Sequence, residues 1–162
     1  MSESSSSGAA RRAQIITSIQ SETGIDEAMI EKLVRRFYER VRADATLAPI
    51  FTAKIADWEP HLQRMCAFWS SVALMSGRYH GQPMQVHSQL PIDARHFDRW
   101  LKLFEETARE ECPPKAALHF IQRACRIAQS LESGVAAARG VVLGKAARFR
   151  LGTDSAQERS HL

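Results

Sequence analysis

Four residues have side chains that could together serve metal chemistry: Tyr38, His61, His87 and Trp100. Tyr38, His61 and Trp100 fall in register with apolar stripes of helical spacing, so we expect them to point into a core. A buried phenol, imidazole or indole needs a hydrogen-bond partner, because leaving such a group unpaired costs about 1–3 kcal/mol. Polar groups that converge in a helical core predict a lined pocket, and histidines in such a pocket are the axial ligands that haem requires.

Taken alone, each of these residues has a simpler interpretation. His61 could be a hydrogen-bonded histidine at the edge of the core, and Tyr38 could place its hydroxyl on a backbone carbonyl. Trp100 could be ordinary core packing, and His87, which follows a loop with glycine and proline, could be a loop histidine. The metal interpretation therefore depends on the set of four and on their order in the chain.

The first half of the chain predicts two helices, which would carry the tyrosine and the first histidine. Asp26 is a candidate N-cap for a helix whose apolar residues recur between residues 30 and 41 at the spacing i, i+3, i+4 and i+7. A connector is expected over residues 44–57, and a second helix begins near Asp57.

The second half predicts one short helix and two longer ones. A break at residues 76–83, with two glycines and a proline, precedes a short helix that carries His87. Asp93 can cap a third long helix, and the proline pair at 113–114 separates it from a fourth. No stretch alternates with period two for long enough to argue a sheet, so the expected fold class is all-α.

The sequence divides into three parts. Residues 1–24 form a Ser-rich N-terminal extension that is expected to be flexible, in which residues 11–20 could form a turn or two of helix. Residues 25–133 hold the strong helix signals and form the expected domain. Residues 134–162 form a basic C-terminal extension, helical or disordered; from position 135 onward, five Lys and Arg against two Asp and Glu supply +3 of the net charge of +4.

Composition and motifs argue against several classes of function. Residues 1–134 carry nearly balanced charge, which does not favour nucleic-acid binding. No apolar run is long enough to span a membrane and no secretory signal is visible, so a cytoplasmic location is expected. The Rossmann, P-loop, zinc-protease and serine-hydrolase motifs are absent, and the single Glu158–His161 pair is too little for a di-iron site.

Three widely spaced cysteines, Cys66, Cys112 and Cys125, limit the cofactor chemistry. None forms CxxC, which argues against zinc-ribbon and thioredoxin functions, and the haem-attachment motif CxxCH is absent. Any haem would therefore be held non-covalently, and the thiols are expected to be free.

Five short motifs follow one another along the chain: FYERVRADATLAPIF at 37–51, WEPH at 58–61, FW at 68–69, GRYHGQPMQVH at 77–87 and FDRWLKLFEE at 97–106. Read in that order, they resemble the truncated haemoglobins, and specifically the third group of that family. The resemblance covers residues 30–131, and the glycine-pair motifs that mark the other two groups are missing. It implies a shortened globin, a two-over-two helical sandwich around non-covalently bound haem b.

The resemblance also implies roles for individual residues. His87 matches the proximal ligand of the haem iron, and His61 matches a distal histidine that gates solvent access. Tyr38 and Trp100 match the hydrogen-bond donors that face the bound ligand. Packing around the haem is implied for Phe37, Phe51, Phe68, Trp69, Phe97 and Phe104.

A haem protein of this kind would bind O2 and other diatomic ligands, such as NO and CO, reversibly. Two donors should slow the release of oxygen, which favours nitric oxide or reactive-species chemistry, or oxygen sensing, over oxygen transport. Enzymatic versions, an NO dioxygenase or a peroxidase-like activity, would need an external reductase that the sequence does not identify. The expected assembly is a monomer or a weak dimer. The alternative function is a cofactor-free all-α interaction module, in which the aromatic residues are only core.

Overall fold

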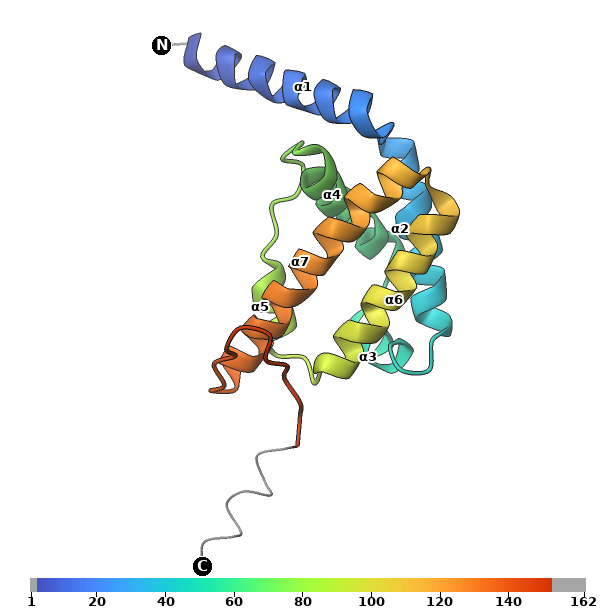
Figure 1. The fold of residues 1–162 in the computed structure, drawn as a ribbon, viewed down its shortest axis with the longest axis vertical. Coiled ribbons are helices and arrows are strands. Elements are labelled where there is room, and N and C mark those ends of the chain that lie inside the picture. Colours follow the sequence, from blue (N-terminus) through green and yellow to red (C-terminus); the bar gives the residue numbers. More distant parts are fainter. Residues whose placement is uncertain (1–2, 153–162) are drawn as a thin grey trace, which may run out of the picture.

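The computed structural model describes residues 3–152, which form helices joined by turns and irregular segments (Figure 1). In chain order the helices are α1 (Glu3–Thr23), α2 (Glu27–Ala43), α3 (Ala48–Lys54), α4 (Trp58–Leu74), α5 (Pro83–Ser88), α6 (Ala94–Glu111) and α7 (Pro114–Ala138). No strand occurs in this range, so the all-α prediction is confirmed. None of these helices is both long and apolar enough to cross a membrane.

Two pairs of helices form the body of the molecule. α2 packs against α4 and α6 packs against α7, while α2 also contacts α6 and α4 also contacts α7. α3 packs against α2, and the short α5 packs against the C-terminal half of α7 (Figure 1). This arrangement is the two-over-two sandwich that the motifs imply.

The first helix of the body begins and packs as its sequence predicts. Asp26 is the N-cap of α2, and its side chain accepts the backbone N–H of Met29 at 2.8 Å. A cap of this type contributes about 1 kcal/mol to the stability of a helix. The apolar positions of the i, i+3, i+4 stripe are the buried ones: Ile30, Leu33, Val34, Phe37, Tyr38 and Val41.

Between α2 and α4 the sequence predicts only a connector, but the structure forms the short helix α3 there. The buried carboxylate of Asp44 holds the entry to this helix, because it accepts the N–H groups of Thr46 and Leu47 and the Nε of Arg99 at 2.6 Å. α3 has no fully buried side chain, which is why its sequence gives no strong amphipathic signal. It places Phe51 against α2.

The boundaries around the short helix α5 follow the turn residues. α4 ends at Leu74, and its C-cap Met75 adopts the left-handed conformation with φ of 58°. α5 begins at Pro83, a residue suited to a first helical turn. α6 begins after Asp93, which accepts the N–H of Arg95 while the ring of His96 accepts the N–H of Asp93.

At the N-terminal end, α1 is a longer helix than the turn or two expected from the sequence. It packs against α4 and α7, and its first half extends beyond them (Figure 1). The alanines and arginines at 9–13 favour helix, and Ile16 and Ile19 pack against the core. The flexibility assigned to residues 1–24 stays a prediction.

At the C-terminal end, the sequence predicts a helix or a disordered tail. The structure instead shows the end of a helix followed by an irregular stretch that packs on the fold. Residues 134–138 belong to α7, and the irregular stretch at 139–151, which we name the C-terminal segment, packs back onto the fold. Phe149 is buried and its carbonyl accepts the N–H of Ala94 at 2.8 Å. The division into an N-terminal extension, a domain at 25–133 and a C-terminal extension stays a prediction, and both its last ten residues and the Glu158–His161 pair lie outside the described residues.

Candidate functional site

His87 lies on α5, one turn after Pro83, and its ring is oriented by its own helix. Its Nδ1 lies 2.6 Å from the carbonyl oxygen of Pro83. A carbonyl can only accept, so Nδ1 carries the hydrogen, and Nε2 of the neutral ring keeps its lone pair. A histidine whose one nitrogen donates to a backbone carbonyl while the other is available is the usual arrangement of a metal-ligating imidazole.

His61 lies on α4 and is half-buried. Its Nε2 is shielded from solvent and has no hydrogen-bond partner among the described residues. Burial is the main cause that lowers the pKa of this imidazole to about 4, and the positive charge of Arg64 acts in the same direction. His61 is therefore neutral at pH 7.

Tyr38 lies on α2 with its ring edge-on to that of His61, the two centroids being 5.1 Å apart. Its side chain also packs against Phe51, at 5.9 Å between centroids. Only 5% of the residue is exposed, and burial raises the pKa of its phenol far above the usual value. Tyr38 is thus a protonated hydrogen-bond donor beside the unpartnered imidazole nitrogen.

Trp58 is a further member of this group that the sequence analysis does not single out. Its ring lies 5.7 Å from His61 and 6.0 Å from Tyr38, and the guanidinium of Arg42 stacks over it at 4.5 Å. The signal that could have found it is its position three residues before His61, which places both side chains on one face of a helix.

Trp100 lies on α6 and reaches the same region through Phe37. Its ring is 5.6 Å from that of Phe37, which in turn is 5.1 Å from Tyr38. Trp100 is half-buried and packs against both apolar clusters of the molecule. The structure therefore links three of the four polar residues predicted for the site, Tyr38, His61 and Trp100, through shared aromatic contacts. His87 lies on α5, and its place in the same site stays a prediction.

The six aromatic residues predicted to pack around a cofactor divide between the site and the core. Phe37 and Phe51 contact Tyr38, and Phe97 is buried among the residues near α5. Trp69 is fully buried and stacks on Phe104 at 4.7 Å, in the interior of the main core, whereas Phe68 packs against Tyr79. Contact of these six with a cofactor stays a prediction.

Comparison with known families identifies the class of protein. A family model described as bacterial-like globin matches residues 18–129. The chain therefore belongs to the bacterial-like globin family. A curated relative, the group 3 truncated haemoglobin of Campylobacter jejuni, is 36% identical over 114 residues, which is 67% of this chain and 90% of the relative.

Two solved structures support the same assignment. The crystal structure of the group III truncated haemoglobin from Campylobacter jejuni aligns with a TM-score of 0.63 at 36% identity, over 67% of this chain and 89% of that chain. The haemoglobin of the thermophilic phototrophic bacterium Chloroflexus aurantiacus aligns with a TM-score of 0.58 at 26% identity, over 70% and 95% of the two chains. The predicted shortened globin fold and the resemblance to the third group of truncated haemoglobins are confirmed.

The residues of the site fit the haem that a globin binds. His87 offers one imidazole nitrogen whose orientation is fixed by Pro83. The buried, unpartnered Nε2 of His61 is the kind of polar atom that needs a partner from a bound group or ligand. Around His61 lie a phenol and aromatic rings, the apolar lining with few polar groups that a cofactor site requires.

Proposed function

We propose that the chain binds haem b non-covalently, that Nε2 of His87 would hold its iron, and that O2, CO and NO would bind reversibly beside Tyr38, His61 and Trp100. The observation that carries the proposal is the 2.6 Å contact between His87 Nδ1 and the Pro83 carbonyl, because it leaves one ring nitrogen as the ligand. The absence of CxxCH from the sequence supports non-covalent attachment.

When bound, haem supplies the iron at which small diatomic ligands attach. Tyr38 is protonated and buried, so its hydroxyl can donate to a ligand held in the pocket. The indole N–H of Trp100 can only donate. Phe51 and Trp58 pack around Tyr38 and exclude water, which strengthens each hydrogen bond made there.

These donors favour retention of a ligand that carries partial negative charge, as oxygen does on ferrous iron. Slow release suits nitric oxide or reactive-species chemistry, or oxygen sensing, better than oxygen transport. Turnover as an NO dioxygenase or a peroxidase would require electrons from an external reductase. Consumption of NO in aerobic buffer, measured with and without such a reductase, separates the enzyme from the carrier or sensor.

The test of the proximal ligand is the absorption spectrum of the chain reconstituted with haem, in its ferric, ferrous and CO-bound forms. His87→Ala should abolish stable haem binding or make it depend on added imidazole, whereas His61→Ala should keep the cofactor. His80→Ala, which changes an exposed histidine in the loop before α5, is the matched control. A normal five-coordinate spectrum in His87→Ala with loss of haem in His61→Ala would reverse the two assignments.

The same experiment separates haem binding from the cofactor-free interaction module. A wild-type chain that shows no Soret band after haem supplementation would leave the proximal and distal roles without support. Membership of a globin family favours the haem protein over the module.

A further inference from the structure

The proximal helix α5 cannot hold its own position. It is six residues long, and none of its side chains is buried. Met84 is 40% and Val86 66% exposed. Because a helix of this length is not stable by itself, contacts from elsewhere in the chain must set its position, and with it the direction of the His87 imidazole.

One of these contacts comes from α7, directly beneath the first turn of α5. A Cβ atom at Gly134 would lie only 1.9 Å from the Sδ of Met84, so the two helices approach closely where α7 has no side chain. This contact supports the beginning of α5, but it does not hold the end of the helix that carries His87.

The end of α5 is held by Arg139, the residue with which the C-terminal segment begins. Its Nη2 donates to the carbonyl of Leu90 at 2.7 Å. The N–H of Leu90 donates in turn to the carbonyl of His87 at 3.0 Å. A charged donor therefore holds Leu90, the residue whose N–H closes the turn after His87, and hydrogen bonds of this kind are stronger than neutral ones.

The apolar side of this turn is covered by the same C-terminal segment. Leu90 and Ile92 are buried in a second apolar cluster, separate from the main core between α2, α4, α6 and α7. The side chains that α7 and the C-terminal segment contribute to it are Ala128, Leu131, Val135, Ala136, Val141, Leu143, Phe149 and Leu151.

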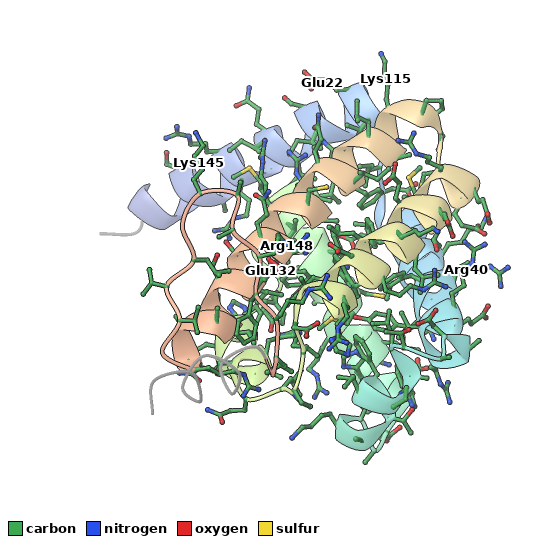
Figure 2. The ribbon with its side chains drawn as sticks, turned by 60° about the horizontal axis from the view of Figure 1, so that its bottom comes forward. Glu22, Arg40, Lys115, Glu132, Lys145 and Arg148 are labelled. Carbon is green, nitrogen blue, oxygen red and sulfur yellow. The ribbon has the colours of Figure 1, made fainter. Side chains whose placement is uncertain are left out.

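The far end of the C-terminal segment is anchored to α6 and α7. Arg148 pairs with the buried Glu132 at 2.9 Å and with Asp98 at 2.6 Å. Figure 2 shows Arg148 and Glu132 lying side by side where the segment crosses in front of α7. The N–H of Leu151 donates to the fully buried Asp93 at 3.0 Å. Fixed at this end, the segment can hold residues 90–92 in place.

We propose that the C-terminal segment positions the proximal helix, with Arg139 as the positioning residue that sets the direction of the His87 ring and the strength of its bond to iron. The proposal rests on the proposed function, because it concerns the support of the proximal ligand. The family match ends at residue 129, so this support lies outside the matched region.

The test compares Arg139→Ala with Lys145→Ala, a control that removes the same charge from an exposed position on the same segment (Figure 2). The readouts are the iron–histidine stretching frequency of the ferrous protein by resonance Raman spectroscopy and the rate of haem transfer to excess apomyoglobin. Arg139→Ala should shift the stretch and speed haem loss by about tenfold, since a hydrogen bond to a charged group is lost. Lys145→Ala should match the wild type in both.

A purely structural role for Arg139 would lower thermal stability without moving the iron–histidine stretch, and that result overturns the proposal. An Arg139→Ala protein identical to the wild type in both readouts overturns it as well. Failure of the proposed function looks different, because the wild type itself would then take up no haem. In that case amide hydrogen exchange at Leu90 still tests whether Arg139 holds this turn. Exchange should be faster in Arg139→Ala than in the wild type, and equal rates would show that Arg139 does not hold the turn.

Discussion

His61 and Tyr38 keep, at physiological pH, the protonation states that a ligand pocket needs. Burial lowers the pKa of His61 to about 4, so the ring is neutral at pH 7. Burial also raises the pKa of Tyr38, so the phenol keeps its proton. The edge-on contact of the two rings at 5.1 Å therefore pairs a neutral imidazole with a neutral donor, and the hydrogen bond that Tyr38 makes to a ligand can be tested by deleting its hydroxyl.

Replacing Tyr38 with Phe should speed the release of oxygen about tenfold or more. The substitution keeps the packing of the ring against Phe51 but removes a donor worth about 0.5–1.5 kcal/mol in a neutral hydrogen bond, and more toward a partly charged ligand. Each 1.4 kcal/mol corresponds to about a factor of ten in rate. Release of carbon monoxide, which carries less negative charge, should change less. Stopped-flow ligand displacement measures both rates.

The control for this change is Tyr79→Phe, because Tyr79 packs against Phe68 and not against His61. Trp100→Phe should act in the same direction as Tyr38→Phe. Since both rings contact Phe37, the two effects should not add in the double variant. Oxygen release that is unchanged in Tyr38→Phe would show that the tyrosine is only core.

For individual residues, the sequence predicts which side chains point into the core, but not which groups from distant parts of the chain they contact. The stripes through Tyr38 and Trp100 predict that both are turned inward, and the structure buries the first and half-buries the second. The stacking of Arg42 on Trp58 depends on the approach of α2 to α4, so no local sequence pattern predicts it. Likewise, nothing near Arg139 in the sequence indicates that its partner is a carbonyl 49 positions earlier.

Among the helices, the sequence predicts those that are long and carry a sustained apolar stripe. The helices α2, α4 and α6 are expected from the sequence because each is long and carries a sustained apolar stripe, with Asp26 and Asp93 as caps. The connector expected between α2 and α4 contains α3, which is too short to show a period. The C-terminal segment has apolar residues without any period, because its partners lie on α6, on α7 and in the turn after α5.

Asp93 joins two of these elements and should make the fold acid-sensitive. It caps α6 and also accepts the N–H of Leu151. Burial acts to raise the pKa of this carboxyl, but the guanidinium of Arg95 and the backbone N–H donors outweigh it and hold the pKa well below its usual value. The unfolded value is about 3.9, so the stabilisation is complete above that pH and is lost as the pH falls from there toward the folded-state value.

Asp93→Asn should therefore lower the free energy of unfolding at pH 7 by about 1–3 kcal/mol, because the amide can still cap α6 but loses its charge-assisted bonds. Below pH 4 the stability of the variant should fall less steeply than that of the wild type. Urea denaturation at several pH values measures both effects. Asp57→Asn is the control, since Asp57 is an exposed N-cap of α4 that makes no capping hydrogen bond. Parallel curves for the wild type and Asp93→Asn would exclude this linkage.

Within residues 3–152 the apolar side chains form two cores, which α6 joins. The main core lies between α2, α4, α6 and α7, and the second contains Leu90, Ile92 and Phe149. Trp100 and the adjacent Leu101 pack against both. α6 therefore joins the two cores, and the second core supports α5 from the side of the C-terminus.

This architecture predicts that residues after position 133, the predicted end of the domain, contribute to the thermal stability of the fold. Truncation after Ser133 removes Val135 and Phe149 from the second core, both of which are buried. Loss of one large buried aromatic side chain alone costs about 3–5 kcal/mol, which corresponds to a fall of about 10 °C in Tm for a domain of this size. Phe149→Ala should reproduce most of that fall, measured by circular dichroism. Val142→Ala, at a position of the same segment that is 92% exposed, should leave Tm unchanged. If truncation after Ser133 left Tm and haem retention at the wild-type level, the second core would contribute nothing to the fold.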